Sequence, residues 1–279
     1  MNSSDASSRS DDMARYFSGE ALYGDDLDAD GIARWFADEE EGYANLGAAD
    51  EEHYQYVYHA WNRLHGYSKL PAGARFANLL AFGSAYGEEL LPIIDRTDAV
   101  TVVDPSDAFV RAEIHGTPAT YIKPGPTGQL PVDDACFDMG TCLGVLHHIP
   151  NVTDVVAEIA RTLKPGAYFL LREPIVSMGD WRQPRSGLTR HERGIPAPIL
   201  RRICEQAGFE IVSAAPCGFA LTPKLLGRLF NPVYNHPVAT RIDSALSRLF
   251  AWNGHYHATS TLARLRATSL FMVLRRQAG

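Results

Sequence analysis

Residues 76–104, FANLLAFGSAYGEELLPIIDRTDAVTVVD, predict the fold of this chain. An apolar run at 76–82 has the length of a buried strand, and a β-branched run at 99–103 ends at Asp104. A glycine turn at 83–87 separates them and leads into residues 88–94. We expect a helix there, because Glu88 and Glu89 suit its positive end. Together these elements form the first half of a doubly wound α/β sheet, in which ligands bind beyond the carboxyl ends of the strands.

Asp104 lies 21 residues after Gly83 (104 − 83). An acid at the end of the second strand can accept hydrogen bonds from both hydroxyls of a ribose, and this spacing is close to the one that the role requires. The spacing therefore predicts a nucleoside-containing ligand at this edge of the sheet.

The remaining pattern predicts further alternation of strands and helices, followed by a helical insertion before the last strand. Strands are expected at 119–122, 137–142, 167–171, 209–213 and 269–274, and helices at 106–113, 153–163 and 198–207. The predicted units are a disordered tail (1–12), a helical cap (13–70), an α/β core (71–219), a helical insertion (220–267) and the last strand of the core (268–279).

Composition excludes several classes of protein. The net charge is −7, but residues 1–60 hold 15 acidic and 3 basic side chains, so the remainder carries 18 acidic and 23 basic ones. This basic excess is too sparse to predict nucleic-acid binding, and it better suits a small anionic partner. Four cysteines without a CxxC pair predict neither a zinc site nor disulfides, and no metal site is expected. Without a signal peptide or a membrane-spanning run, we expect a cytoplasmic protein.

Four stretches carry a resemblance to a known family: AFGSAYG, VTVVD, LPVDDACFDMGTCLGVLHHIPN and RTLKPGAYFLL. In this order the chain resembles the class I S-adenosylmethionine-dependent methyltransferases, in the subgroup that modifies small molecules such as sugars. The resemblance covers about residues 74–215 and the last strand. It implies a seven-stranded, mostly parallel Rossmann-like sheet with helices on both faces.

The resemblance also implies the cofactor, S-adenosyl-L-methionine, and the residues around it. Ala81 and Ala85 depart from the acid and the glycine that the family usually has at these positions. The residues expected to contact the cofactor are Gly83, Ser84, Ala85, Gly87, Asp104, Pro105 and Cys142.

His147 and Glu173 are the candidate catalytic residues. His147 follows the predicted fourth strand and Glu173 ends the fifth, so both would emerge at one edge of the sheet. A neutral imidazole can accept a proton near neutral pH, and a neighbouring carboxylate would orient it. Some sugar O-methyltransferases of this family resemble this arrangement. The alternative is a salt bridge from Glu173 to Arg172 or Arg182. We expect His148, the histidine usual in the family, to be structural.

The loop 177–196, SMGDWRQPRSGLTRHERGIP, is the candidate acceptor site. Its arginines could bind phosphate or carboxylate oxygens in bidentate fashion, and the alternative is a solvated surface loop. The expected contacts come from Arg182, Arg185, His191 and Arg193. The predicted acceptor is a hydroxyl of a sugar or anionic polyol, such as a nucleotide sugar or a surface-polysaccharide precursor. A natural-product phenol, amine or carbon acid, and a non-catalytic binding protein, are the alternatives.

The predicted insertion has an apolar stripe at helical spacing. It includes Leu225, Leu229, Ile242, Leu246 and Leu249. Such a stripe is more often a core or a homodimer face than a membrane anchor. Because the same segment carries basic residues, an interfacial helix that contacts a membrane peripherally is a further alternative.

Overall fold

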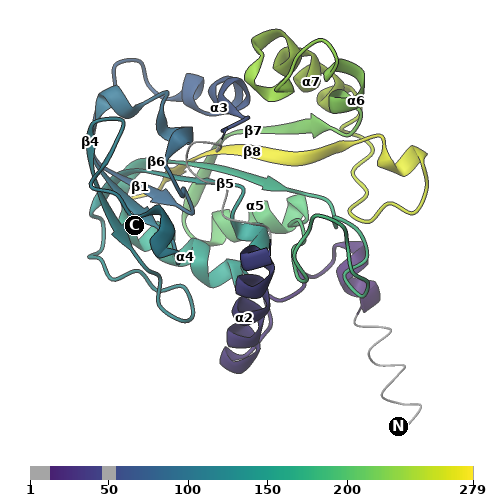
Figure 1. Cartoon of the computed structure of the whole chain (residues 1–279), viewed down its shortest axis with the longest axis horizontal. Coiled ribbons are helices and arrows are strands. Elements are labelled where there is room, and N and C mark those ends of the chain that lie inside the picture. Colours follow the sequence, from purple (N-terminus) through teal and green to yellow (C-terminus); the bar gives the residue numbers. More distant parts are fainter. Residues whose placement is uncertain (1–12, 46–54, 279) are drawn as a thin grey trace.

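One mixed sheet of eight strands organises the molecule (Figure 1). The structure is a computed structural model that describes residues 13–45 and 55–278. The strand order is β3-β4-β2-β1-β5-β6-β8-β7. Strand β8 is antiparallel to both β6 and β7, whereas β4, β2, β1, β5 and β6 run parallel. The strands are β1 (Phe76–Phe82), β2 (Thr97–Val103), β3 (Glu113–Ile114), β4 (Thr117–Ile122), β5 (Phe137–Leu143), β6 (Leu163–Pro174), β7 (Phe209–Phe219) and β8 (Ala267–Arg276).

The prediction of seven strands was wrong by one short strand. Strand β3 pairs antiparallel with β4, so it extends the edge of the sheet by two residues. His115 and Gly116 connect the two strands, with φ values of 46° and 81°. Two successive residues of positive φ make the tight turn that suits a two-residue hairpin. The remaining seven strands have the predicted doubly wound arrangement.

Helices cover both faces of the sheet, and the alternation of side chains along β1 explains why. Leu80 and Phe82 belong to one hydrophobic core, which α4 (Val152–Thr162) and α5 (Ala197–Gln206) cover. Leu79 and Ala81 point to the other face and belong to a second core, which includes Trp61 of α3 (His59–His65). Because successive strand residues face opposite sides, one apolar strand supports two cores.

Two predicted helices do not form. Residues 88–94 make single 3-10 turns at Glu88–Leu90 and Ile94–Arg96, because Pro92 has no N–H to continue an α-helix. Residues 106–113 make one 3-10 turn, Asp107–Phe109, and then enter β3. A helix of eight residues gains little from its own hydrogen bonds, so strand pairing at Glu113 and Ile114 prevails.

The helical segments before β1 lie on different faces of the sheet. Phe36 of α2 (Ala29–Asn45) packs against the core of α4 and α5, whereas α3 packs against β8 and α7 (Pro237–Leu249). In Figure 1, α2 lies on the same side of the sheet as α4 and α5, opposite α3 and α7. The predicted tail, residues 1–12, lies outside the described residues.

The insertion before β8 contains α7 and the shorter α6 (Thr222–Leu226). Among the residues that the structure describes, no helix is long and apolar enough to cross a membrane.

Candidate functional site

The glycine loop after β1 is held in a conformation that depends on its glycines. Gly83 and Gly87 have φ values of 68° and 75°, and Ala85 between them has 45°. The loop is fixed by a hydrogen bond from Gly83 N to Val103 O, 2.8 Å, and by one from Gly87 N to Ser84 O, 2.7 Å. A Cβ on Gly83 would lie 2.5 Å from both methyl groups of Val145, so the loop and the turn after β5 are in close contact.

Asp104 lies at the end of β2, beside this loop. Its carboxylate accepts hydrogen bonds from the backbone N–H of Ser106, 3.0 Å, and of Ala85. Burial raises the pKa of Asp104 although these N–H groups oppose the shift. Pro105 beside it is exposed.

The loop offers a buried polar atom to a ligand. Ser84 is 4% exposed, and its Oγ has no hydrogen-bond partner of standard geometry among the described residues. It still lies near enough to the carboxyl of Glu89 to favour the ionised form of that group. A hydroxyl without a satisfied hydrogen bond, a strained glycine loop and a buried acid fit the polar groups of a nucleoside cofactor. Cys142, in contrast, is fully buried within the core, with its Sγ 3.9 Å from Glu173 Oε1.

Glu173 and His147 meet as predicted. The His147 Nδ1 lies 2.8 Å from Glu173 Oε2, and Glu173 is fully buried at the end of β6. The same carboxylate accepts hydrogen bonds from the backbone N–H groups of Val145, Leu146 and His147, at 2.9, 2.8 and 3.3 Å. Burial acts to raise the pKa of Glu173, but the hydrogen bond and charge of His147 and the N–H groups outweigh it, so this pKa is lowered.

The alternative salt bridge from Glu173 to an arginine does not form. Arg172 donates to Asn62 Oδ1 and Leu143 O, at 2.7 and 3.0 Å, and its guanidinium lies over the ring of Tyr58. Arg182 pairs with Asp180. Glu173 therefore pairs with neither arginine, and its carboxylate fixes the histidine turn and the orientation of the His147 ring.

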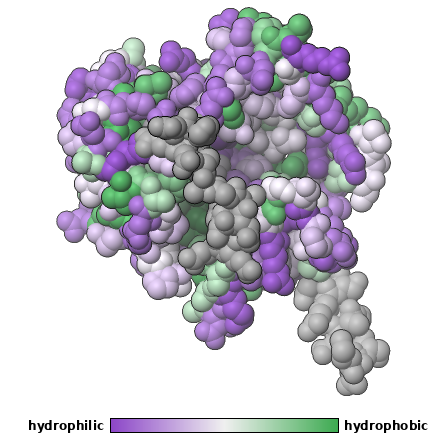
Figure 2. Space-filling model, in the orientation of Figure 1, coloured by the Kyte–Doolittle hydropathy of each residue, from purple (hydrophilic) through white to green (hydrophobic). Residues whose placement is uncertain are grey.

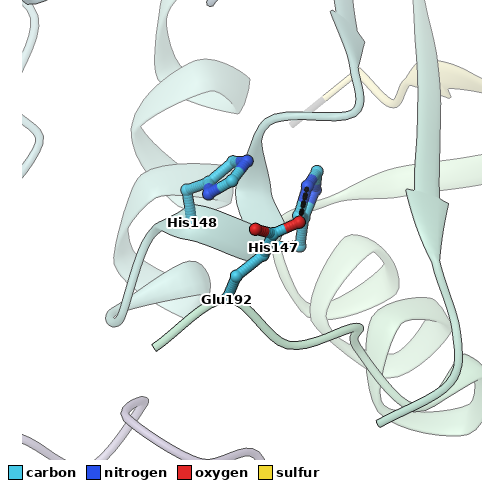
Figure 3. A group of neighbouring side chains, drawn as sticks. All are labelled: His147, His148 and Glu192. Atoms are coloured by element: carbon cyan, nitrogen blue, oxygen red, sulfur yellow. Dashed lines mark ion pairs between the residues drawn. The ribbon is translucent and has the colours of Figure 1, made fainter. Parts of the chain in front are cut away.

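The other ring nitrogen of His147 faces a second carboxylate (Figure 3). His147 Nε2 lies 3.7 Å from Glu192 Oε1, and the rings of His147 and His148 are 4.0 Å apart between centroids. One ligand atom from each of His147, His148 and Glu192 lies within 4.8 Å of the other two. Two imidazoles and a carboxylate are a donor set that suits transition metals. The expectation of no metal stays a prediction.

Glu39 and Thr189 complete the surroundings of the two histidines, and neither was predicted from the sequence. Glu39 of α2 lies 3.2 Å from His148 Nδ1 and accepts a hydrogen bond of 2.6 Å from Thr189 Oγ1. Thr189 N donates to Glu192 Oε2, 3.1 Å. Glu39 lies 109 residues before His148 in the chain, so no local pattern could have paired them.

Most of the predicted acceptor residues are engaged within the protein. Arg193 is fully buried and donates to the backbone carbonyls of Leu146, His147, Ile149, Pro150 and Tyr23. Arg185 donates to four carbonyls of its own loop. His191 stacks on Trp35 and lies 2.7 Å from Asp38, whereas Arg182 is exposed. Arg193 therefore fixes the loop against the histidine turn, and the half-buried Arg185 fixes the conformation of the loop itself.

Glu89, which the sequence predicted at the start of a helix, is another buried acid near the glycine loop. It is 6% exposed, and burial raises its pKa to about 7. It lies two residues after Gly87, in the 3-10 turn where a helix had been expected.

Comparison with known proteins agrees with this architecture. Residues 80–171 match the family model described as "Methyltransferase domain". A protein of Mycolicibacterium smegmatis named as a probable S-adenosylmethionine-dependent methyltransferase is 30% identical over 131 residues, 46% of this chain and 49% of that protein. The Botryococcene C-methyltransferase of Botryococcus braunii is 40% identical over 68 residues, 23% of this chain and 18% of that enzyme. The chain thus spans at most about half the length of these relatives.

A solved S-adenosylmethionine-dependent methyltransferase of Mesorhizobium loti has a similar fold. Its TM-score is 0.52 at 16% identity, covering 77% of this chain and 97% of that chain. At this identity the similarity establishes the Rossmann-like α/β fold. The family match and the Mycolicibacterium relative support an S-adenosylmethionine-dependent methyltransferase and imply S-adenosyl-L-methionine as the cofactor.

Proposed function

We propose that this chain transfers a methyl group from S-adenosylmethionine to a hydroxyl of a small molecule, with His147 as the general base. The observation that carries the proposal is the hydrogen bond between His147 Nδ1 and the buried Glu173. This hydrogen bond orients the ring, so that the other ring nitrogen, Nε2, faces the loop that contains Glu192. The turn that bears His147 also contacts the glycine loop through Val145 and Gly83.

The chemistry divides between cofactor and protein. When bound, S-adenosylmethionine supplies a methyl group on a sulfonium that is already activated for transfer. The residues that would hold the cofactor are the glycine loop, Ser84 and Asp104. The protein must align the acceptor oxygen, exclude water and accept the proton that the oxygen loses. His147 can accept that proton only when neutral, and the Glu173 carboxylate then stabilises the imidazolium that forms.

For the acceptor we propose a sugar or another polyol. The loop 177–196, which lies against the histidine turn, supports this choice because it carries polar and charged side chains. An anionic group on the acceptor would meet Arg182 or Arg190, which are exposed and pair with Asp180 and Asp38. The terminal guanidinium nitrogens of Arg185 and Arg193 already donate to backbone carbonyls. A nucleotide sugar or polysaccharide precursor would meet these requirements.

A second acceptor class has a specific observation in its favour. Tyr23, Trp35 and His191 line a hollow beside α2, whose lining also includes the charged Arg34, Asp38 and Arg190. Its aromatic rings suit a phenol, an amine or an apolar carbon acid. The similarity to a named C-methyltransferase points the same way. A screen that contains both nucleotide sugars and aromatic or isoprenoid acceptors separates the two classes by which of them yields S-adenosylhomocysteine.

Titration calorimetry tests the cofactor part of the proposal. Asp104→Ala should weaken S-adenosylmethionine binding by about 1.5–3 kcal/mol, as expected for lost hydrogen bonds to a charged group. Asp107→Ala is the matched control, because Asp107 is three residues away and forms an exposed ion pair with Lys123. Equal affinities of the wild type and Asp104→Ala would remove Asp104 from the site.

A further inference from the structure

Helix α7 exposes its large apolar side chains to solvent, and the side that it packs on the protein is made of small and polar residues with one buried acid. The residues of α7 that pack on the molecule are Ala239, Thr240, Asp243, Ser244 and Ser247. Val238, Ile242 and Leu249 recur at helical spacing on the other side and are 51%, 39% and 67% exposed. The apolar stripe of the sequence is therefore not the core of the insertion.

Asp243 explains why the helix is oriented in this way. Its carboxylate is fully buried and accepts hydrogen bonds from Gly218 N, Phe219 N and Thr222 Oγ1, at 2.9, 2.8 and 2.7 Å. These bonds connect the middle of α7 to the end of β7 and the start of α6. If α7 rotated to bury the apolar stripe, the Asp243 carboxylate would lose these three hydrogen bonds. The observed orientation, with the stripe exposed, is therefore the stable one.

Exposed apolar side chains gather on this insertion. Leu225 and Leu229, in and after α6, are 59% and 76% exposed, and Trp252, after α7, is 70% exposed. Of the eleven large hydrophobic residues that are exposed in the described part of the chain, seven lie between Leu225 and Leu262. Solvent-exposed apolar residues are ordinary when scattered, but a cluster marks an interaction surface. Figure 2 shows hydrophobic residues among hydrophilic ones at the end of the molecule that α6 and α7 form.

The same surface is positively charged. Lys224, Arg228, Arg241 and Arg248 are exposed beside the apolar residues. Between residues 211 and 279 the sequence has one acid, Asp243, and it is buried. We call these four basic residues, together with Leu225, Leu229, Val238, Ile242, Leu249 and Trp252, the insertion face.

We propose that the insertion face binds to the surface of an anionic lipid membrane. Amphipathic helices that lie in the plane of a membrane combine an apolar stripe with Lys and Arg, and tryptophan is favoured at the boundary between lipid and water. Anionic lipids attract the four basic side chains while the leucines, Ile242 and Trp252 enter the headgroup region. Helix α7 has 13 residues, so it lies on the membrane and does not span it.

Charge also distinguishes a membrane from a second copy of the chain. A symmetric dimer through the insertion face would bring like charges together, and the face has no exposed acid that could pair with them. The proposal is independent of the methyl-transfer reaction, because none of these residues belongs to the glycine loop or to the histidine turn.

Vesicle binding of the full chain tests the proposal, with tryptophan fluorescence as the readout. Trp35, Trp61 and Trp181 are buried, at 2%, 4% and 8% exposure, so Trp252 is the reporter. Phosphatidylglycerol-containing vesicles should shift the emission to the blue and sediment the protein, and pure phosphatidylcholine vesicles should do neither. The shift should be lost in Trp252→Phe, and 0.5 M salt, roughly a 4 Å screening length, should weaken binding.

Charge reversal provides the matched comparison. Arg241→Glu with Arg248→Glu should reduce binding to anionic vesicles by more than about tenfold. Arg34→Glu with Arg202→Glu, two exposed arginines outside the insertion, should leave it unchanged. Equal binding by both double variants, or no binding of the wild type to either vesicle, would overturn the proposal. Self-association that Leu249→Ser abolishes, without vesicle binding, would assign the face to a second copy instead.

Discussion

Among the described residues, three buried carboxylates surround the two adjacent histidines, and their positions in the sequence determine which of them could be predicted. Glu173 follows a recognisable strand, so its pairing with His147 was predictable from the edge at which both strands end. Glu39 and Glu192 come from a distant helix and an irregular loop, and only the folded chain brings them together. Arg193 was predicted to bind the acceptor, but its guanidinium donates hydrogen bonds to five backbone carbonyls of the protein.

Glu89 gives a pH-dependent prediction. Its pKa is about 7 in the fold against an ordinary 4.5, because burial disfavours the charged form. Below pH 4.5 the carboxyl is neutral in both the folded and unfolded states. Between about pH 4.5 and 7 the unfolded chain loses this proton first, so the contribution of Glu89 to stability falls as pH rises. The full cost above pH 7 is about 3 kcal/mol.

Glu89→Gln should therefore be more stable than the wild type at pH 8, and the difference should shrink towards pH 4. Chemical denaturation at both pH values measures it. Glu113→Gln, at an exposed carboxyl, is the control and should show no such trend. A Glu89→Gln variant that is less stable than the wild type at pH 8 would indicate that the ionised carboxylate is needed in the fold.

Among the secondary-structure elements, strands were predicted better than helices. Apolar runs of strand length located β1, β2 and β5, because burial on both faces leaves little ambiguity. The helices expected after β1 and β2 failed because Pro92 and a short hairpin intervene. Helix α7 was predicted from its apolar stripe, but its orientation depends on Asp243, whose three partners lie 21 to 25 residues away.

The glycine loop gives a prediction with a matched pair of variants. Gly83 and Gly73 have similar φ values, +68° and +74°, but a Cβ at Gly73 would meet nothing within 4 Å. Gly73→Ala should cost about 1–2 kcal/mol from backbone conformation alone. Gly83→Ala should cost about 1–3 kcal/mol more, because its methyl group would collide with Val145. Thermal unfolding measures both costs. An equal loss of stability in the two variants would contradict this prediction, because it would show that the Val145 side chain moves aside without strain.

In the molecule as a whole, the candidate methyl-transfer site is separate from the insertion, which carries both basic and exposed apolar side chains. The glycine loop, Asp104 and the histidine turn lie at the carboxyl ends of β1, β2 and β5, where a doubly wound sheet binds ligands. The insertion packs on β7 through α7 and carries the basic excess that composition had revealed. Composition could locate this charge but could not show which side of α7 faces solvent, since that depends on contacts with β7.

The most direct test of the account is the turnover of His147→Ala with an identified acceptor. We predict that kcat falls by about 10²–10⁴, the usual contribution of a positioned general base, while the affinity for S-adenosylmethionine hardly changes. The wild-type rate should fall at acid pH, because a protonated imidazole cannot accept the acceptor's proton. His255→Ala, at an exposed histidine, is the control and should retain full activity. A near-normal kcat in His147→Ala with a flat pH profile would contradict the assignment of His147 as the base.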